Sequence, residues 1–216
     1  MRTMKFLYAA VVSLFMGVAA NAQSTAKDFF KNDAKVLYLG IDFTNMRLIN
    51  DSNADARDIR DRQFVGINEV VVNEPKKYKL EKYFHKDAVD TDLGPINKTN
   101  EKTDPDDIKS TASSDFNRLT PEDIAKSVKG IDLKNRTGLG VVLVMEAFSQ
   151  TKKEISCWFT VIDMKTKKVL VAERVTGKQN KFAFTSFRNN WAGAVKDALE
   201  NIDAKYKDWK TQYSEE

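Results

Sequence analysis

The sequence predicts an α/β fold, in which helices cover a mixed sheet that carries a C-terminal antiparallel hairpin. The first sign is the nearly continuous apolar run of residues 34–43, typical of a strand covered on both faces. The second is a group of strand-like segments at 139–148, 155–164 and 168–176, of which the last two flank a tight turn. The third is the spacing of apolar residues by three and four across 186–210, which predicts a long amphipathic helix.

The first half of the chain follows the strand at 34–43 with a polar loop at 50–53 and a helix over 55–73. Pro75 is expected to end or kink this helix, because proline cannot continue the backbone hydrogen bonds. Residues 76–84 are compatible with a second short helix or with a strand. Residues 85–117 are rich in polar residues, so we expect an irregular surface excursion, with room for one short strand at about 88–93.

The second half begins with a clear helix start, in which Thr120 caps the helix and Pro121 takes its first position. Gly130 should end this helix. In the hairpin, Lys167 stands at a turn position that often requires glycine, so a positive φ is expected there. The apolar stripe of the final helix consists of Phe187, Trp191, Ala194, Val195, Ala198, Leu199, Ile202, Tyr206 and Trp209.

Residues 1–22 have the layout of a secretory signal peptide, with Arg2 and Lys5 ahead of an apolar run over residues 6–20. Small residues end this segment, so we expect cleavage after Ala22 and a single exported domain over 23–216. The domain should be periplasmic in a Gram-negative source and secreted otherwise. The apolar run is shorter than the ~20 residues of a membrane span. Gln23 stands where a bacterial lipoprotein has its cysteine, so no lipid anchor is expected.

The composition gives little reason to expect a charged partner or a cofactor. Removal of the leader leaves a net charge of about +2, which does not suggest nucleic-acid binding. The single cysteine, Cys157, lies in an apolar stretch and is best explained as a buried small side chain. A reactive thiol would need exposure and a basic partner, and the only histidine, His85, is distant in sequence.

The candidate metal and nucleotide motifs lack residues that such sites require. Asp51, Asn53 and Asp55 have the spacing of a calcium loop, but the turn glycine is missing and Arg62 replaces the final glutamate. The segment Gly138–Leu139–Gly140 leads into a strand, whereas a dinucleotide loop follows a strand and opens a helix. Two acidic groups of the polar middle are better explained as solvated loop charge; these are Asp87, Asp90 and Asp92, and Asp104, Asp106 and Asp107.

Two further features offer candidate functional residues. Asp42 and Glu146 could act as a glycosidase-type acid pair if the fold brought them together. The aromatic segment 182–191 offers a possible contact surface, although docking of the final helix onto the sheet explains its rings better. The candidate contact residues are Phe182, Phe184, Phe187, Arg188, Asn189 and Trp191.

The last third of the chain also carries a resemblance. The segments Val-Val-Leu-Val-Met-Glu at 141–146 and Phe-Thr-Val-Ile-Asp-Met-Lys-Thr-Lys-Lys-Val-Leu at 159–170, followed by the long helix, resemble small exported envelope proteins. These include the TolB N-terminal domain family, the curli-secretion lipoproteins and the lipoprotein activators of penicillin-binding proteins. The Phe-Arg-Asn-Asn-Trp segment at 187–191 is similar to one in uncharacterised exported Bacteroidetes proteins.

The resemblance, together with the lack of a catalytic motif, favours a non-enzymatic exported module that binds another envelope protein. Self-assembly through exposed aromatic residues or an edge strand is a further possibility. The resemblance transfers no catalytic residue and no cofactor. The chain departs from it in three features, which are the missing lipidation cysteine, Lys167 in place of the turn glycine, and the polar middle. The alternative is a hydrolase of glycans or peptides that uses a carboxylate pair.

Overall fold

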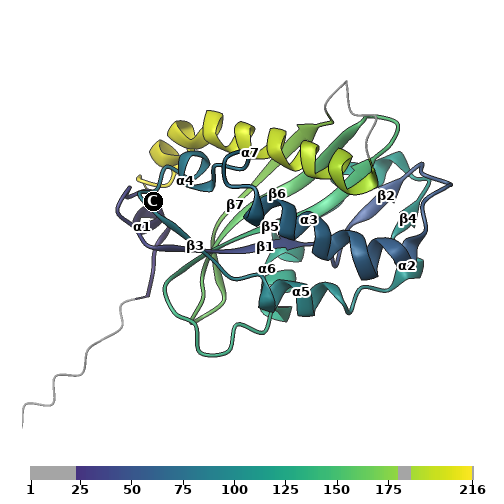
Figure 1. The fold of residues 1–216 in the computed structure, drawn as a ribbon. Coiled ribbons are helices and arrows are strands. Elements are labelled where there is room, and N and C mark those ends of the chain that lie inside the picture. Colours follow the sequence, from purple (N-terminus) through teal and green to yellow (C-terminus); the bar gives the residue numbers. More distant parts are fainter. Residues whose placement is uncertain (1–22, 180–185, 216) are drawn as a thin grey trace, which may run out of the picture.

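The computed structural model describes residues 23–179 and 186–215 and confirms the α/β class. The sheet is mostly parallel and continues into an antiparallel hairpin (Figure 1). Its strands are β1 (Val36–Asp42), β2 (Arg47–Ile49), β3 (Val89–Thr91), β4 (Lys109–Ser110), β5 (Leu139–Ser149), β6 (Glu154–Asp163) and β7 (Lys168–Lys178). The predicted strands at 34–43, 139–148, 155–164 and 168–176 are therefore all present.

Strand β5 is the centre of the sheet. On one side it pairs in parallel with β1 along its first half and with β2 along its last residues, so β1 and β2 form one interrupted row. The short strands β3 and β4 lie outside β1 and β2, respectively, and are parallel to them. On the other side β5 pairs with β6, and β6 with β7, both antiparallel. Among the described residues, β7 is therefore an edge strand.

Helices cover both faces of the sheet, which gives three layers (Figure 1). The larger apolar core lies under α1 (Ala26–Phe29), α3 (Phe64–Asn73), α4 (Leu80–Tyr83) and α7 (Phe187–Gln212). The opposite face is covered by α5 (Gly94–Asn100), α6 (Pro121–Gly130) and the 3₁₀ turn η3 (Ser113–Asn117). A short helix α2 (Ala56–Asp58) and a π-helical turn η1 (Ile59–Gln63) lead directly into α3.

Local sequence features account for several element boundaries. The Thr120 hydroxyl accepts from the Asp123 N–H at the start of α6, and Asp123 bonds back to the cap, as in a capping box. Lys167 has a φ of 57°, as predicted for the hairpin turn. The predicted stripe of α7 faces the core, where every residue is buried except the half-buried Phe187. Gly177 lets α7 approach closely, because a Cβ there would lie 2.1 Å from the Ala194 carbonyl oxygen.

The polar middle of the chain is more regular than its sequence suggests. Residues 85–117 contain β3, at the place where one short strand was expected, and also α5, β4, η3 and a 3₁₀ turn η2 (Pro105–Asp107). Ile96, Ile108 and Phe116 anchor this segment to the core. Each element is too short to show an apolar period, which explains why the sequence suggested an irregular excursion. Residues 80–83 form the short helix α4, one of the two options for 76–84.

None of the helices in the described part of the chain has an apolar stretch long enough to cross a lipid bilayer. The predicted signal peptide, residues 1–22, lies outside the described residues. The chain then enters the fold at once, because the Ser24 N–H donates to Asp163 Oδ2 at 2.9 Å and Phe29 and Phe30 are buried.

Candidate functional site

Two asparagine side chains complete the edge of β1 where its neighbour β3 stops. Strand β3 pairs with β1 only as far as Tyr38. Beyond that point Asn68 Oδ1 accepts from the Ile41 N–H at 2.7 Å, and Asn100 Oδ1 accepts from the Phe43 N–H at 2.7 Å. The Asn100 amide nitrogen also donates to the Ile41 carbonyl at 2.9 Å. Because a carboxamide has the donor and acceptor of a peptide group, the two side chains serve in place of a missing strand.

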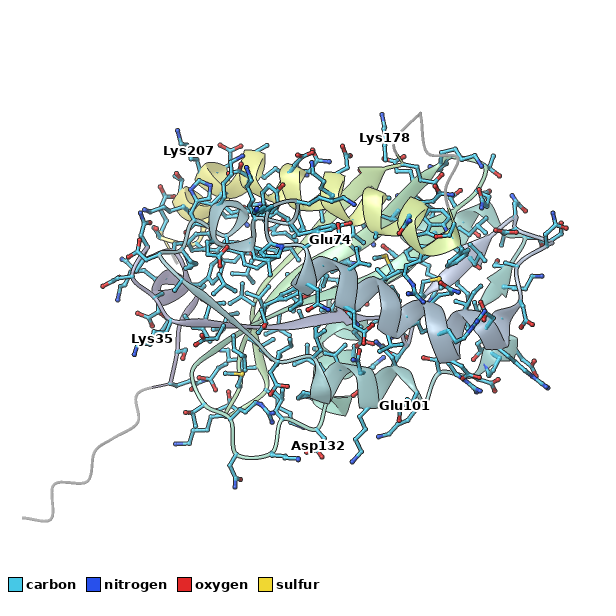
Figure 2. The ribbon with its side chains drawn as sticks, in the orientation of Figure 1. Lys35, Glu74, Glu101, Asp132, Lys178 and Lys207 are labelled. Atoms are coloured by element: carbon cyan, nitrogen blue, oxygen red, sulfur yellow. The ribbon has the colours of Figure 1, made fainter. Side chains whose placement is uncertain are left out.

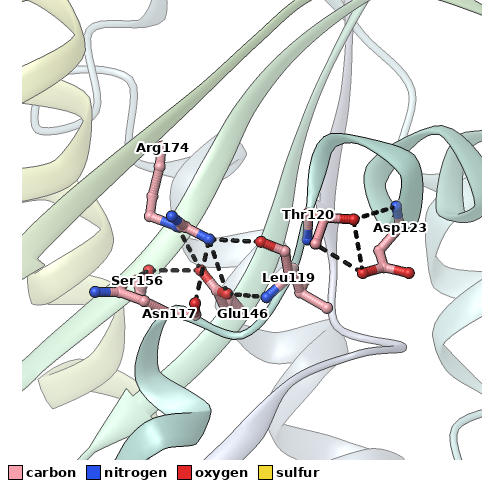
Figure 3. A network of polar contacts seen from close by, with 7 residues as sticks. All are labelled: Asn117, Leu119, Thr120, Asp123, Glu146, Ser156 and Arg174. Atoms are coloured by element: carbon pink, nitrogen blue, oxygen red, sulfur yellow. Dashed lines mark hydrogen bonds and ion pairs between the residues drawn. The ribbon is translucent and has the colours of Figure 1, made fainter.

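Glu146 lies at the centre of a buried polar network (Figure 3). A bulge in β5 between Met145 and Ala147 sets Glu146 out of the pairing register with β6. Its carboxylate accepts from Ser156 Oγ at 2.8 Å and from Arg174 Nε at 2.9 Å, and also from the Leu119 N–H. These bonds satisfy both oxygens of a fully buried charge.

Arg174 extends this network toward α6. Its guanidinium donates to the Leu119 carbonyl at 2.6 Å and lies 4.5 Å from the centre of the Trp158 ring. Leu119 immediately precedes the helix cap Thr120, so Glu146 and Arg174 together fix the start of α6 on β5 and β7 (Figure 3). This arrangement uses the Glu146 carboxylate to hold the fold together and leaves no open side for a substrate.

Asp42, the other member of the suggested acid pair, is also fully buried. Its Oδ1 accepts from the Thr44 N–H at 2.9 Å and from the Thr44 hydroxyl at 2.6 Å. Its Oδ2 has no partner among the described residues, and burial raises the pKa of this carboxyl above its usual value. Asp42 aligns with Val144, so Glu146 lies two residues further along the neighbouring strand. Neither acid lines any of the described clefts, so this particular pair offers the hydrolase alternative no accessible carboxylate.

The predicted contact surface at 182–191 has to be corrected for Trp191. This ring is fully buried and stacks on Phe148 with a centroid distance of 4.4 Å. Phe187 is half-buried and packs against the same two rings. The described aromatics therefore dock α7 onto the sheet, which was the favoured explanation, and a buried ring cannot contribute to a contact surface. Phe182 and Phe184 lie outside the described residues.

The two polar residues among the predicted contact residues differ in exposure. Arg188 is half-buried and donates to the Arg62 carbonyl at 3.2 Å, which joins the first turn of α7 to the π-helical turn η1. Its guanidinium occupies the space over Gly66, where a Cβ would lie 2.2 Å from it. Asn189 is exposed. Of the predicted contact residues that are described, Asn189 is thus the one that faces solvent fully.

The thiol and the imidazole have separate structural environments. Cys157 is buried in β6, and burial raises the pKa of its thiol to about 12, so it is held as a neutral side chain. His85 Nε2 lies 2.7 Å from Asp203 Oδ1, and its ring stacks on Tyr206 at 4.0 Å.

Lys86, next to His85, is a feature that sequence reasoning missed. It is only 6% exposed, and its ammonium donates to the Tyr206 hydroxyl at 3.1 Å and lies 4.3 Å from the centre of the Phe29 ring. Burial, which outweighs the effect of nearby charges, lowers the pKa of Lys86 to about 8. A lysine in a polar segment carries no sequence signal that would indicate burial.

The acidic groups show no metal-binding geometry. Within residues 23–179 and 186–215, no group of three or more His, Cys, Asp or Glu side chains could hold a metal ion. In the calcium-like segment, Asp55 caps α2 through the N–H groups of Arg57 and Asp58. Asp51 accepts from the Ala54 N–H at 3.1 Å, so this segment is a polar loop that leads into a capped helix.

The outer edge of β7 is a long strand edge that no other described strand covers. At its C-terminal end, α7 side chains bond the outward-facing groups: Asn201 donates to the Thr176 carbonyl and Asp197 accepts from the Lys178 N–H, both at 2.8 Å. Because the direction of backbone groups repeats every second residue, Ala172 and Arg174 face the same way. No partner for their outward N–H and C=O groups is found among the described residues.

Comparison with known proteins gives no indication of function for this chain. No protein-family model matches the chain, and a search of curated proteins finds no match either. Two features of the described residues are developed below: the open edge of β7, and a cleft lined by polar residues at the ends of β2 and β4.

Proposed function

We propose that this protein is an exported, non-enzymatic module that binds an extended segment of another envelope protein along the edge of β7. The observation that carries the proposal is the unpaired outward backbone at Ala172 and Arg174. An added strand would gain main-chain hydrogen bonds there, as in other cases of strand addition. The edge is supported from both sides, since α6 and α7 both contact β7.

Charge favours a different protein over a second copy as the occupant. Two copies paired antiparallel about Ala172 and Arg174 would bring Lys168 of each opposite Lys178 of the other, and like charges in direct opposition are destabilising. Both lysines are exposed, and Lys178 projects into solvent at the end of β7 (Figure 2). An extended segment with acidic side chains would meet both of them favourably.

Export to the envelope is supported by the signal-like residues 1–22 and by the resemblance of the last third to exported envelope proteins. In a Gram-negative source the proposed location is the periplasm. The absence of a cysteine at position 23 supports release after cleavage over lipid anchoring.

The test places a photo-crosslinking amino acid at the exposed Lys168 and captures partners from envelope extracts. Ala172→Pro removes the outward N–H without breaking a bond to β6, whereas Ala172→Ser is the matched control that keeps it. We expect one reproducible protein partner whose capture is lost in the Pro variant and retained in the Ser variant. Capture that is equal in both variants, or no capture above an uncrosslinked control, would contradict the proposal.

A further inference from the structure

A polar cleft of about 480 Å³ lies outside the carboxyl ends of parallel strands β2 and β4, and β5 ends beside it. This volume is within the range of small-molecule sites. The lining comes from two segments that follow or end these strands; its residues are Asn50, Asp51, Ser52, Lys109, Ser110 and Thr111. The cleft is separated from the edge of β7 by β5 and β6, so it is a different surface from the proposed protein-binding edge.

The topology explains why the chain opens here. Strands β2 and β4 are neighbours and parallel, but their connections leave toward opposite faces of the sheet. After β2 the chain enters α2 and α3, which pack on the larger core, whereas after β4 it enters η3 and α6 on the other face. Adjacent loops that diverge in this way leave a crevice, and open α/β sheets bind ligands at such switch points.

Hydrogen bonds to neighbouring residues hold several polar groups of the cleft in place. The Asn50 amide nitrogen donates to Thr151 Oγ1 at 3.0 Å, and Asp51 Oδ2 accepts from the Gln150 side chain at 2.9 Å. The Lys109 ammonium donates to the Ser52 carbonyl at 2.9 Å. These contacts orient the side chains that line the cleft. Within the described part of the chain, they leave the side-chain amide oxygen of Asn50 without a hydrogen-bond partner. The same holds for the Ser52 and Thr111 hydroxyls, which are exposed.

The chemistry of the lining selects the class of ligand. Asp51 and Lys109 balance each other, so the cleft has little net charge. A phosphate is disfavoured, because the helix start beside the cleft is already occupied by the Asp55 carboxylate, which accepts from the Arg57 N–H at 2.9 Å. The remaining free groups are hydroxyls and an amide oxygen, which together donate and accept hydrogen bonds. We infer that the cleft binds a neutral polyhydroxylated ligand, a sugar unit.

The test is a titration of the isotope-labelled protein followed by heteronuclear NMR. The probes are methyl glucoside, N-acetylglucosamine and mannose, each up to about 10 mM, which is above the Kd of millimolar binding. Inorganic phosphate is the anionic comparison. We expect at least one sugar to shift the amide signals of residues 50–52 and 109–111, and phosphate to leave them unchanged.

Matched variants separate binding at the cleft from general effects. Thr111→Val keeps the side-chain shape but removes the hydroxyl. It should raise the Kd about fivefold, which corresponds to the loss of one neutral hydrogen bond. Thr137→Val makes the same change at an exposed residue just before β5 begins, at the opposite end of that strand, and should leave the Kd unchanged. Shifts centred elsewhere, a stronger response to phosphate, or no response to any of the three sugars would overturn the inference.

Discussion

The substitution Lys86→Met tests whether a buried ammonium destabilises this fold at neutral pH. The pKa of Lys86 is lowered by burial from 10.5 to about 8 in the folded protein. The unfolded chain therefore binds this proton more tightly than the folded chain does, so the charge lowers stability fully below pH 8 and progressively less between pH 8 and 10.5. The penalty is about 3 kcal/mol at pH 7 and falls below about 1 kcal/mol at pH 10, since one pKa unit corresponds to ~1.4 kcal/mol.

Methionine removes the charge but leaves the Tyr206 hydroxyl without its 3.1 Å partner, at a cost of about 1 kcal/mol. We therefore expect the variant to be about 2 kcal/mol more stable than the wild type at pH 7, with the gain lost near pH 10. Urea unfolding followed by tryptophan fluorescence at both pH values measures the difference. Lys207→Met is the control, because Lys207 projects from α7 into solvent (Figure 2). A stability difference that does not change with pH would refute the reasoning.

Three further substitutions test the contacts described above, each by chemical denaturation. Glu146→Gln should cost about 1.5–3 kcal/mol, because the buried side chain loses the charge that accepts from Ser156, Leu119 and the partly exposed Arg174. Lys126→Met at an exposed ion pair should change stability by less than about 1 kcal/mol, and equal effects of the two substitutions would contradict a structural role for the network. Asn100→Leu should cost about 2–3 kcal/mol, because buried backbone groups of β1 lose their partners, and a neutral result would mean that water replaces them. Gly177→Ala should cost about 1–3 kcal/mol by pushing α7 from the sheet, while Gly130→Ala, with open space around it, should not destabilise; the reverse order would contradict the packing.

The parts of the fold that the sequence predicts are those with a repeated local signal. The stripe of α7 and the Thr120–Pro121 start of α6 are of this kind, and their bounds agree with the structure to within a few residues. Strands β2 and β4 were missed because two or three residues show no alternation.

The contacts of the candidate sites depend on residues far apart in sequence. Asn100 completes the edge of β1 at a separation of 57 residues, and Leu119 meets Glu146 at 27. No local pattern encodes such pairs, because their geometry depends on which strands become neighbours. The cleft beside β2 and β4 had no sequence signal either, because it forms only where these two short strands lie next to each other.

The parallel pairing of β1 with β5 also governs the order in which the chain can fold. Val36 pairs with Leu139, so about one hundred residues must be synthesised before the first long strand meets its partner. Loops of this length close at an entropic cost, whereas β5, β6, β7 and α7 can assemble through contacts close in sequence. The N-terminal half, which emerges first, therefore lacks the central strand of its sheet until β5 follows. This order of assembly is compatible with the proposed export, because a chain without its central strand pairing is still extended enough to pass through a secretion channel.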